Sequence, residues 1–207
     1  MKIEIFVLGM LQNNSYILFN HAGENAIVID PANSITPVID YLKSHNLFLN
    51  AILITHAHFD HIMGCEELKR AFPDVKIYLH QDDLPLWVNQ GGADAFGFEM
   101  GGLPKPDILL DKNTTVMIGE FSLQIFHTPG HTPGHVIYYS PDDHVAFCGD
   151  LIFEGSVGRT DLPGGDFNQL YESIHNVIYT LPDRTKLFPG HGNQTTVEKE
   201  KSSNPYV

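Results

Sequence analysis

Four side chains that can bind a metal ion lie within six residues: His56, His58, Asp60 and His61. They directly follow an apolar run at residues 51–54, which is typical of a buried strand. Two imidazoles at positions i and i+2 of an extended loop can bind one ion, while Asp60 and His61 turn toward a second. Imidazole and carboxylate together suit zinc, iron or manganese. A single-metal site that leaves Asp60 or His61 without an ion is the alternative.

Three more side chains of the same chemistry lie at the ends of later strands, each beside a glycine: His131, Asp150 and His191. A glycine next to a ligand lets the backbone approach the metal closely, because it carries no Cβ. Each of these residues is a weak signal alone. Together, they indicate a metal site through the order in which they follow the histidine-rich loop.

Hydrophobic periodicity predicts the elements that must position these residues. Strands are expected at residues 2–10, 15–19, 25–30, 51–54, 76–79, 115–118, 121–126, 136–139, 145–147 and 186–188. Helices are expected at residues 35–46, 65–72, 82–89 and 167–181, with Ser34 and Asp166 as N-caps. Strands with few helices, then strands again, predict an α+β sandwich of four layers (αββα), with two sheets face to face and helices outside. The 207 residues are enough for a single domain, 1–207.

Composition excludes several classes of partner. Twenty-five acidic against 12 basic residues give a net charge of −13, which argues against nucleic acid and anionic membrane as partners. No run approaches the ~18 apolar residues of a membrane-spanning helix. The two cysteines, Cys65 and Cys148, form no Cys-x-x-Cys pair, and no signal peptide is evident, so we expect a cytoplasmic protein. The oligomeric state is left open.

Three further features have two interpretations each. Asp30, at a strand end before Pro31, is either a turn former or a hydrogen-bond partner that orients a ligand histidine. His135 either supports the site or is simply packed. The glycine-rich segment 91–107 is either a flap over a substrate or a surface loop with packed aromatic residues.

In the order His-x-His-x-Asp-His, His, Asp, His, the motifs resemble those of the metallo-β-lactamase superfamily. Nearly the whole chain resembles its glyoxalase II (hydroxyacylglutathione hydrolase) group. The resemblance implies two mixed sheets and two metal ions. It assigns the first metal to His56, His58 and His131, the second to Asp60, His61 and His191, and the bridging position to Asp150.

The stretch Gly-Arg-Thr-Asp at residues 158–161 is similar to the compact YcbL-like branch, or type II glyoxalase II. It is also similar to the persulfide dioxygenases of this fold. Longer glyoxalase II enzymes hold glutathione with a Lys and a Tyr in this loop, whereas this sequence has Arg159 in the Lys-like place. A guanidinium binds carboxylates bidentately, so Arg159 is expected to bind substrate. An ion pair with Asp161 is the alternative.

The resemblance implies a metal-dependent hydrolase that cleaves a small-molecule thioester such as S-lactoylglutathione. A hydroxide shared by two divalent ions would attack the carbonyl, with Asp60 as the catalytic carboxylate. Zinc is the expected metal, and the same ligands accept iron or manganese. The alternative activity is that of a persulfide dioxygenase, with a single iron held by two histidines and one aspartate. The Asp-His pair at the second metal argues against a true β-lactamase, and the complete ligand set argues against a non-catalytic binding module.

Overall fold

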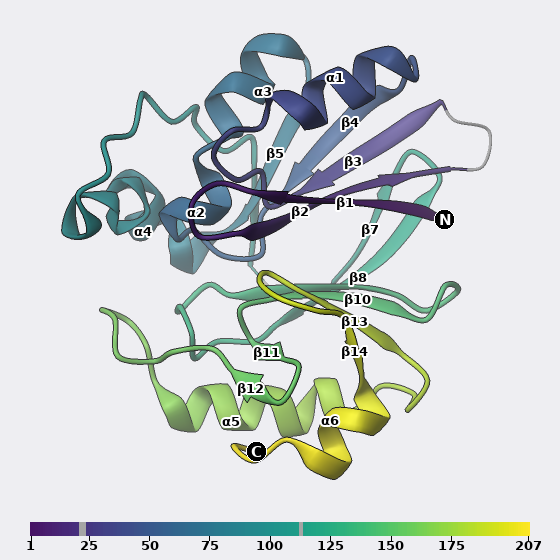
Figure 1. The fold of residues 1–207 in the computed structure, drawn as a ribbon, viewed down its shortest axis with the longest axis vertical. Coiled ribbons are helices and arrows are strands. Elements are labelled where there is room, and N and C mark those ends of the chain that lie inside the picture. Colours follow the sequence, from purple (N-terminus) through teal and green to yellow (C-terminus); the bar gives the residue numbers. More distant parts are fainter. Residues whose placement is uncertain (21–23, 112–113) are drawn as a thin grey trace.

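The computed structural model describes residues 1–20, 24–111 and 114–207, and its centre is a pair of sheets packed face to face (Figure 1). The first sheet has the strand order of the sequence: β1 (Lys2–Leu8), β2 (Asn13–Phe19), β3 (Asn25–Ile29), β4 (Phe48–Leu53), β5 (Lys76–His80) and β6 (Ile108–Leu110). The strands β1 to β3 pair antiparallel, and β3 to β6 pair parallel. The sheet is therefore mixed.

The second sheet has the order β14-β13-β10-β9-β8-β7. Its strands are β7 (Thr114–Ile118), β8 (Phe121–His127), β9 (Val136–Ser140), β10 (Val145–Gly149), β13 (Lys186–Pro189) and β14 (Thr195–Thr196). It is also mixed, because β10 pairs parallel with β13 while the other neighbours pair antiparallel. The short strands β11 (Ile152–Phe153) and β12 (Ser156–Val157) form a separate hairpin.

Helices cover the outer face of each sheet (Figure 1). On the first sheet lie α1 (Thr36–Ser44) and α3 (Cys65–Ala71), and on the second lie α5 (Phe167–Asn176) and α6 (Val197–Ser203). Shorter helices follow β4 and β5: α2 (Phe59–Ile62), the 3₁₀ helix η1 (Gln81–Asp83), α4 (Leu84–Val88) and the 3₁₀ helix η2 (Gln90–Phe96). The layers run helix, sheet, sheet, helix, which confirms the αββα prediction.

Alternation along the strands divides the apolar side chains between two packing interfaces. In β2, Tyr16 and Leu18 face the second sheet, whereas Ile17 packs beneath the helices of the first layer. Tyr16 meets the rings of Phe147 and Phe188 edge to face, at 5.2 and 5.7 Å between ring centroids. Both faces of β2 are buried, so its second half, residues 16–19, is continuously apolar rather than alternating.

Three helix predictions were wrong in detail. Ser34 is not the N-cap of α1, because its φ of +64° is left-handed and its successor Ile35 occupies the cap position. The helix expected at 167–181 ends at Asn176, where Val177 leaves helical geometry, and a separate 3₁₀ turn η3 (Ile178–Thr180) follows. The expected helix 82–89 is divided between η1 and α4.

The N-cap at Asp166 is confirmed, and it provides a test of the fold's local energetics. Its carboxylate accepts hydrogen bonds from the backbone N–H groups of Asn168 and Gln169, at 2.8 and 3.1 Å. Asp166→Ala removes both bonds and should lower the free energy of unfolding by about 1 kcal/mol. Asp166→Asn, which keeps a capping oxygen, should stay close to the parent protein in denaturant unfolding. Equal losses in the two variants would contradict the capping role.

Candidate metal centre

The histidine-rich loop leaves the carboxyl end of β4 and runs into α2. His56 lies in the extended stretch, His58 is the N-cap residue of α2, and Asp60 and His61 lie inside the helix. The change from extended to helical backbone between His58 and Asp60 turns the later pair away from the earlier pair. One short segment can therefore serve two adjacent positions, as the spacing predicts.

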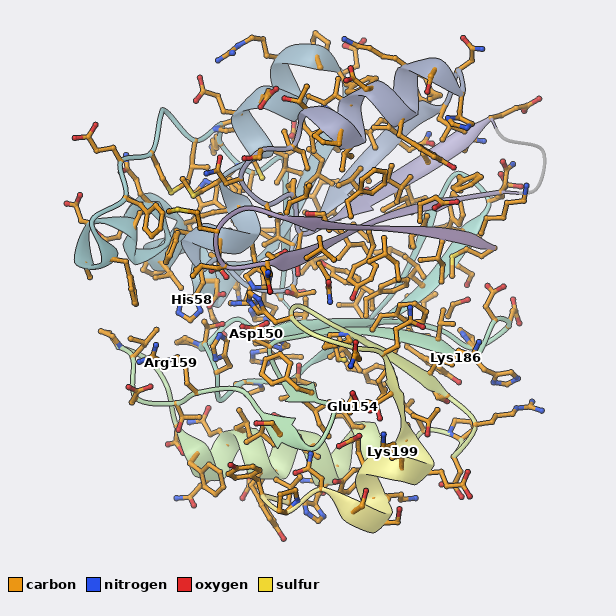
Figure 2. The ribbon with its side chains drawn as sticks, in the orientation of Figure 1. His58, Asp150, Glu154, Arg159, Lys186 and Lys199 are labelled. Carbon is orange, nitrogen blue, oxygen red and sulfur yellow. The ribbon has the colours of Figure 1, made fainter. Side chains whose placement is uncertain are left out.

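The other three residues come from the facing sheet. His131 lies in the loop between β8 and β9, and Asp150 directly follows β10. His191 is the second residue after the end of β13. His58 and Asp150 lie between the two sheets, with Arg159 on a loop beside them (Figure 2). All seven residues predicted as ligands meet at this edge of the sandwich.

Three imidazoles form the first group. The Nε2 atom of His131 lies 2.8 Å from Nδ1 of His58 and 3.2 Å from Nε2 of His56. One ligand atom from each of the three residues falls within 4.8 Å of the other two. This is the spacing of donors around a single ion, and the members are those predicted for the first metal.

Asp60, His61 and His191 form the second group. The Oδ2 atom of Asp60 is 3.1 Å from Nε2 of His191 and 3.6 Å from Nε2 of His61. Oxygen and nitrogen donors converge here, again with the membership that was predicted.

Asp150 lies between the two groups. Its Oδ2 atom is 3.7 Å from Nε2 of His131 and 3.6 Å from Nε2 of His191, while Oδ1 is 3.4 Å from Nε2 of His61. The carboxylate therefore faces one imidazole of the first group and two of the second.

Hydrogen bonds on the far side of the rings fix which nitrogen faces the centre. Nδ1 of His131 donates to the carbonyl of Arg159 at 2.7 Å, and Nδ1 of His191 donates to the carbonyl of Leu11 at 3.1 Å. Nδ1 of His61 donates to Oδ2 of Asp30 at 2.9 Å. A carbonyl oxygen can only accept, so in a neutral ring the proton is on Nδ1 and the Nε2 lone pair faces inward.

The converging nitrogen and oxygen atoms are suited to binding a cation. Among the described residues, two of these atoms, Nε2 of His61 and Oδ1 of Asp150, are buried without a hydrogen-bond partner. Lone pairs of His56, His58 and His131 face one another, which is unfavourable unless a proton or a metal ion lies between them. Imidazole and carboxylate donors in these two groups suit divalent transition metals.

The two groups differ in their protonation. Burial, together with the neighbouring His131, lowers the pKa of His58 to about 3, and burial followed by the nearby His61 lowers the pKa of His56 well below its usual value. Burial also disfavours the charged form of His61, but Asp60, Asp150 and Asp30 outweigh it and raise the pKa of His61 well above its usual value. The first group therefore consists of neutral imidazoles, whereas the second retains positive charge among carboxylates.

Asp30 orients ligands, which decides between its two interpretations. Its Oδ1 accepts from the backbone N–H of Thr55 at 2.7 Å, and its Oδ2 accepts from the Thr55 hydroxyl at 2.6 Å and from His61. The same hydroxyl lies 3.1 Å from Nδ1 of His56 and accepts a hydrogen bond from it. One buried carboxylate thus supports His61 directly and His56 through Thr55.

Packing around the ligands is equally tight. The ring of His135 stacks on that of His56 at 5.3 Å, and its Nδ1 lies 2.9 Å from the hydroxyl of Thr128. His135 therefore contacts a predicted ligand directly rather than lying in the general core.

A Cβ atom on Gly190 would overlap Oδ1 of Asp150 and the ring of His61, so only glycine fits beside His191.

A third cluster of metal-binding side chains has a less suitable geometry. His80, Asp82 and His127 also lie close together. The rings of His80 and His127, however, stack at 4.1 Å with only 12° between their planes. Imidazole lone pairs lie in the ring plane, so two parallel rings do not both point at one ion.

A pocket of about 360 Å³ opens onto the seven-residue centre. Besides the ligands, it is lined by Leu11, Phe59, Phe96, Phe98, Arg159 and Leu162. Phe96 and Phe98 pack on Phe59, with ring centroids 5.3 and 4.9 Å away. The segment 91–107 therefore supplies part of an apolar wall beside the centre.

The guanidinium of Arg159 forms a two-point ion pair. Its Nε and Nη2 atoms donate to the two carboxylate oxygens of Asp161 at 2.7 and 2.8 Å. The alternative predicted for Arg159 is therefore present, while the side chain still lines the pocket. Substrate binding by Arg159 stays a prediction.

Several supporting groups were not foreseen from the sequence. The carbonyls of Leu11 and Arg159 hold ligand histidines, yet backbone groups carry no residue-type signal. Thr55 directly precedes His56, and its position is the one available clue to its role. The two carbonyls could be assigned only after the chain was folded.

Fold and centre together define a two-sheet protein with two adjacent groups of potential metal donors, and sequence comparison agrees with this class. The family model for the metallo-β-lactamase superfamily matches residues 8–191. The chain therefore belongs to the metallo-β-lactamase superfamily, whose members typically bind divalent metals.

Two relatives match along their whole length. The probable metallo-hydrolase YqgX of Bacillus subtilis is 37% identical, with 100% of this chain and 98% of the relative covered. Hydroxyacylglutathione hydrolase GloC of Haemophilus influenzae is 34% identical, again with 100% and 98% covered.

Three solved structures are similar as well. BLEG-1, described as a B3 metallo-β-lactamase, is 39% identical with a TM-score of 0.91 and 99% of each chain covered. TTHA1623 in a di-iron-bound form is 38% identical with a TM-score of 0.89, and 99% of this chain and 100% of that chain are covered. ETHE1 from Myxococcus xanthus is 25% identical with a TM-score of 0.81 and 99% and 84% covered.

In the described part of the chain, no helix is both long enough and apolar enough to cross a membrane.

Replacing Asp30 tests whether its hydrogen bonds hold the metal donors. Asn at this position has only one acceptor oxygen, and its amide would face the Thr55 hydroxyl and Nδ1 of His61, which both donate. We expect Asp30→Asn to bind metal about 10- to 100-fold more weakly, as judged by chelator competition on metal-loaded protein. Asp40→Asn, an exposed position on α1, is the matched control. Unchanged retention of metal in Asp30→Asn would refute the orienting role.

Proposed function

We propose that this protein is a metal-dependent hydrolase of small thioesters, similar to the compact glyoxalase II enzymes. The observation that carries the proposal is the seven-residue centre, in which Asp150 faces both groups of donors beneath an open pocket. We assign His56, His58 and His131 to one metal ion, Asp60, His61 and His191 to a second, and Asp150 to both. Zinc is the proposed metal, and iron or manganese would suit the same donors.

The relatives support a hydrolase of this kind. GloC is named as a hydroxyacylglutathione hydrolase, and YqgX is named as a probable metallo-hydrolase. The names alone do not assign a substrate here. The proposal of a thioester depends on what the pocket residues can do chemically.

Two divalent ions held at this centre would lower the pKa of a water molecule toward ~7 and polarise a carbonyl group. Burial opposes the charge on Asp60, but His61 and His191 stabilise it and lower its pKa, so this residue stays a carboxylate that can accept a proton. Water adds to the carbonyl carbon of the thioester and the C–S bond breaks, which gives a carboxylic acid and a thiol. A thiol of pKa ~8.5 leaves as thiolate without a separate general acid.

The pocket walls suit a substrate with an apolar and an anionic part. Leu11, Phe96, Phe98 and Leu162 provide apolar surface, and Arg159 provides a guanidinium at the opening. Glutathione thioesters carry carboxylates that such a group can bind bidentately. We therefore propose a carboxylate-bearing thiol carrier as the leaving group.

A second candidate is a persulfide dioxygenase with a single iron. The Gly-Arg-Thr-Asp stretch favours it, the similarity to ETHE1 is consistent with either candidate, and TTHA1623, solved in a di-iron-bound form, shows a related chain that binds iron. Two histidines and one carboxylate of the centre would hold the iron in that case. The two candidates differ in the number of metal ions and in the use of oxygen, so one sample distinguishes them.

The deciding experiment measures metal content and hydrolysis of S-D-lactoylglutathione on the same purified protein. We expect two metal ions per chain, loss of turnover on chelation, and a fall in kcat of at least about 100-fold in Asp60→Ala. Asp74→Ala, an exposed position before β5, should behave like the parent protein.

Other outcomes would replace the proposal. One iron per chain, no hydrolysis, and oxygen uptake with glutathione persulfide would establish the dioxygenase. Faster hydrolysis of a β-lactam than of any thioester would identify the protein as a β-lactamase, which is how BLEG-1 is described. Two metal ions with thioesterase activity only on other thiol carriers would exclude glutathione.

The Arg159–Asp161 pair gives a separate prediction about substrate binding. Arg159→Gln should raise KM for a carboxylate-bearing thioester about 10-fold with little change in kcat, because one charged hydrogen-bonded contact is lost. Asp161→Asn should lower KM, since it releases the guanidinium from its partner. The backbone carbonyl that holds His131 is retained in both variants. Unchanged KM values in both would leave Arg159 as a surface ion pair only.

A further inference from the structure

A second buried carboxylate, Asp83, lies close to the centre without belonging to it. Asp83 is fully buried and occupies the cap position between η1 and α4. An aspartate at this position normally caps the helix that follows, and here its side chain makes no cap hydrogen bond. The carboxylate is used elsewhere.

Its partners are two loops that carry predicted ligands. Oδ2 accepts from the backbone N–H of Ala57 at 2.8 Å and from the hydroxyl of Thr132 at 2.8 Å. Oδ1 accepts from the backbone N–H of Gly134 at 2.6 Å. Burial raises the pKa of Asp83, and these three hydrogen bonds act in the opposite direction.

The positions of these donors along the chain are informative. Ala57 lies between His56 and His58, and Thr132 directly follows His131. Every donor is therefore within three residues of a member of the first group. The two loops come from different sheets, so Asp83 joins the halves of the sandwich at the place where three imidazoles must meet.

Asp83 is tightly packed against the residues that donate to it. A Cβ atom on Gly134 would overlap the backbone nitrogen of Asp83 and crowd its Cβ and Cγ atoms. Glycine at 134 therefore lets the second loop approach near enough to donate. Ala57 and Thr132 are fully buried, so water cannot replace the carboxylate as their acceptor.

We infer that Asp83 is a positioning residue that sets the separation of His56 and His58 from His131, and so the geometry of the first metal position. This inference rests on the dinuclear centre of the proposed function. It is distinct from the role of Asp30, which contacts His61 and supports His56 through Thr55 from the side of the first sheet. Asp83 acts through residues beside the metal donors, by accepting from two backbone N–H groups and from the Thr132 hydroxyl.

Stepwise titration of metal-free protein with Co²⁺ tests the inference, because visible absorption reports ligand geometry at each position separately from activity. Asn at position 83 would offer one acceptor oxygen to three donors. We expect Asp83→Asn to weaken Co²⁺ binding at the three-histidine position about 10- to 100-fold and to change its absorption, with the second position little affected. Asp74→Asn, an exposed position before β5, is the matched control and should titrate like the parent protein.

Thr132 supplies a milder pair of variants in case Asp83→Asn does not fold. Thr132→Val removes the hydroxyl donor while keeping the shape, and Thr132→Ser keeps the donor. Weaker Co²⁺ binding at the first position in Thr132→Val but not in Thr132→Ser would support the inference. Equal binding in both variants would overturn it.

The remaining outcomes are also decisive. If Asp83→Asn is less stable without metal but binds Co²⁺ at the first position with unchanged affinity and spectrum, Asp83 is merely structural and the inference fails. If the parent protein binds no metal at the three-histidine position, the dinuclear proposal itself fails. The parent titration therefore separates failure of the proposed function from failure of the inference.

Discussion

The structure depends on the convergence of imidazole nitrogens and carboxylates at one edge of two facing sheets. The three-histidine group is unfavourable by itself, because burial keeps its imidazoles neutral and their ring nitrogens face one another. The Nε2 atom of His131 lies within 3.2 Å of two other imidazole nitrogens, and Asp150 contributes a carboxylate shared between both groups. Hydrogen bonds behind the rings of His56, His61, His131 and His191 determine the directions of these rings. The fold can be understood as the support for those hydrogen bonds.

That support comes from opposite directions. Asp30 at the end of β3 holds Thr55 and His61, while backbone carbonyls of Leu11 and Arg159 hold His191 and His131. Asp30 is buried, so its carboxylate loses much when a donor moves away, since water does not reach it. Because the acceptors come from both sheets and from the loops between them, the geometry of the centre and the packing of the sandwich are coupled. The core between the sheets, with Tyr16 against Phe147 and Phe188, keeps the two sets of loops at a fixed distance.

The parts that could be predicted from the sequence are those with a local signal. Apolar runs located the long strands, and the order of the ligand types indicated the four-layer fold and the seven residues that converge. Asp166 was recognised as a cap, but Ser34 was not a cap, because its left-handed backbone depends on how the chain leaves β3. Short elements such as β6, β11, β12 and β14 were missed, since two or three residues show no period. The carbonyl partners of His131 and His191 had no signal at all, because their role depends on tertiary contacts. The assignment of the seven residues to particular metal ions stays a prediction.

The division between centre and pocket explains why the substrate is harder to infer than the chemistry. The ligands lie at strand ends and are held by buried hydrogen bonds, so their types and spacing are strongly constrained. The pocket walls come from loops: Leu11 between β1 and β2, Phe96 and Phe98 on the segment after α4, and Arg159 and Leu162 after β12. Loop side chains can change without disturbing the core, so relatives that retain the same donors can act on different molecules. GloC is named as a hydroxyacylglutathione hydrolase and BLEG-1 is described as a B3 metallo-β-lactamase, which is consistent with this reasoning. Specificity in this chain should therefore depend on the apolar wall and on whether Arg159 exchanges Asp161 for a substrate carboxylate, rather than on the metal donors.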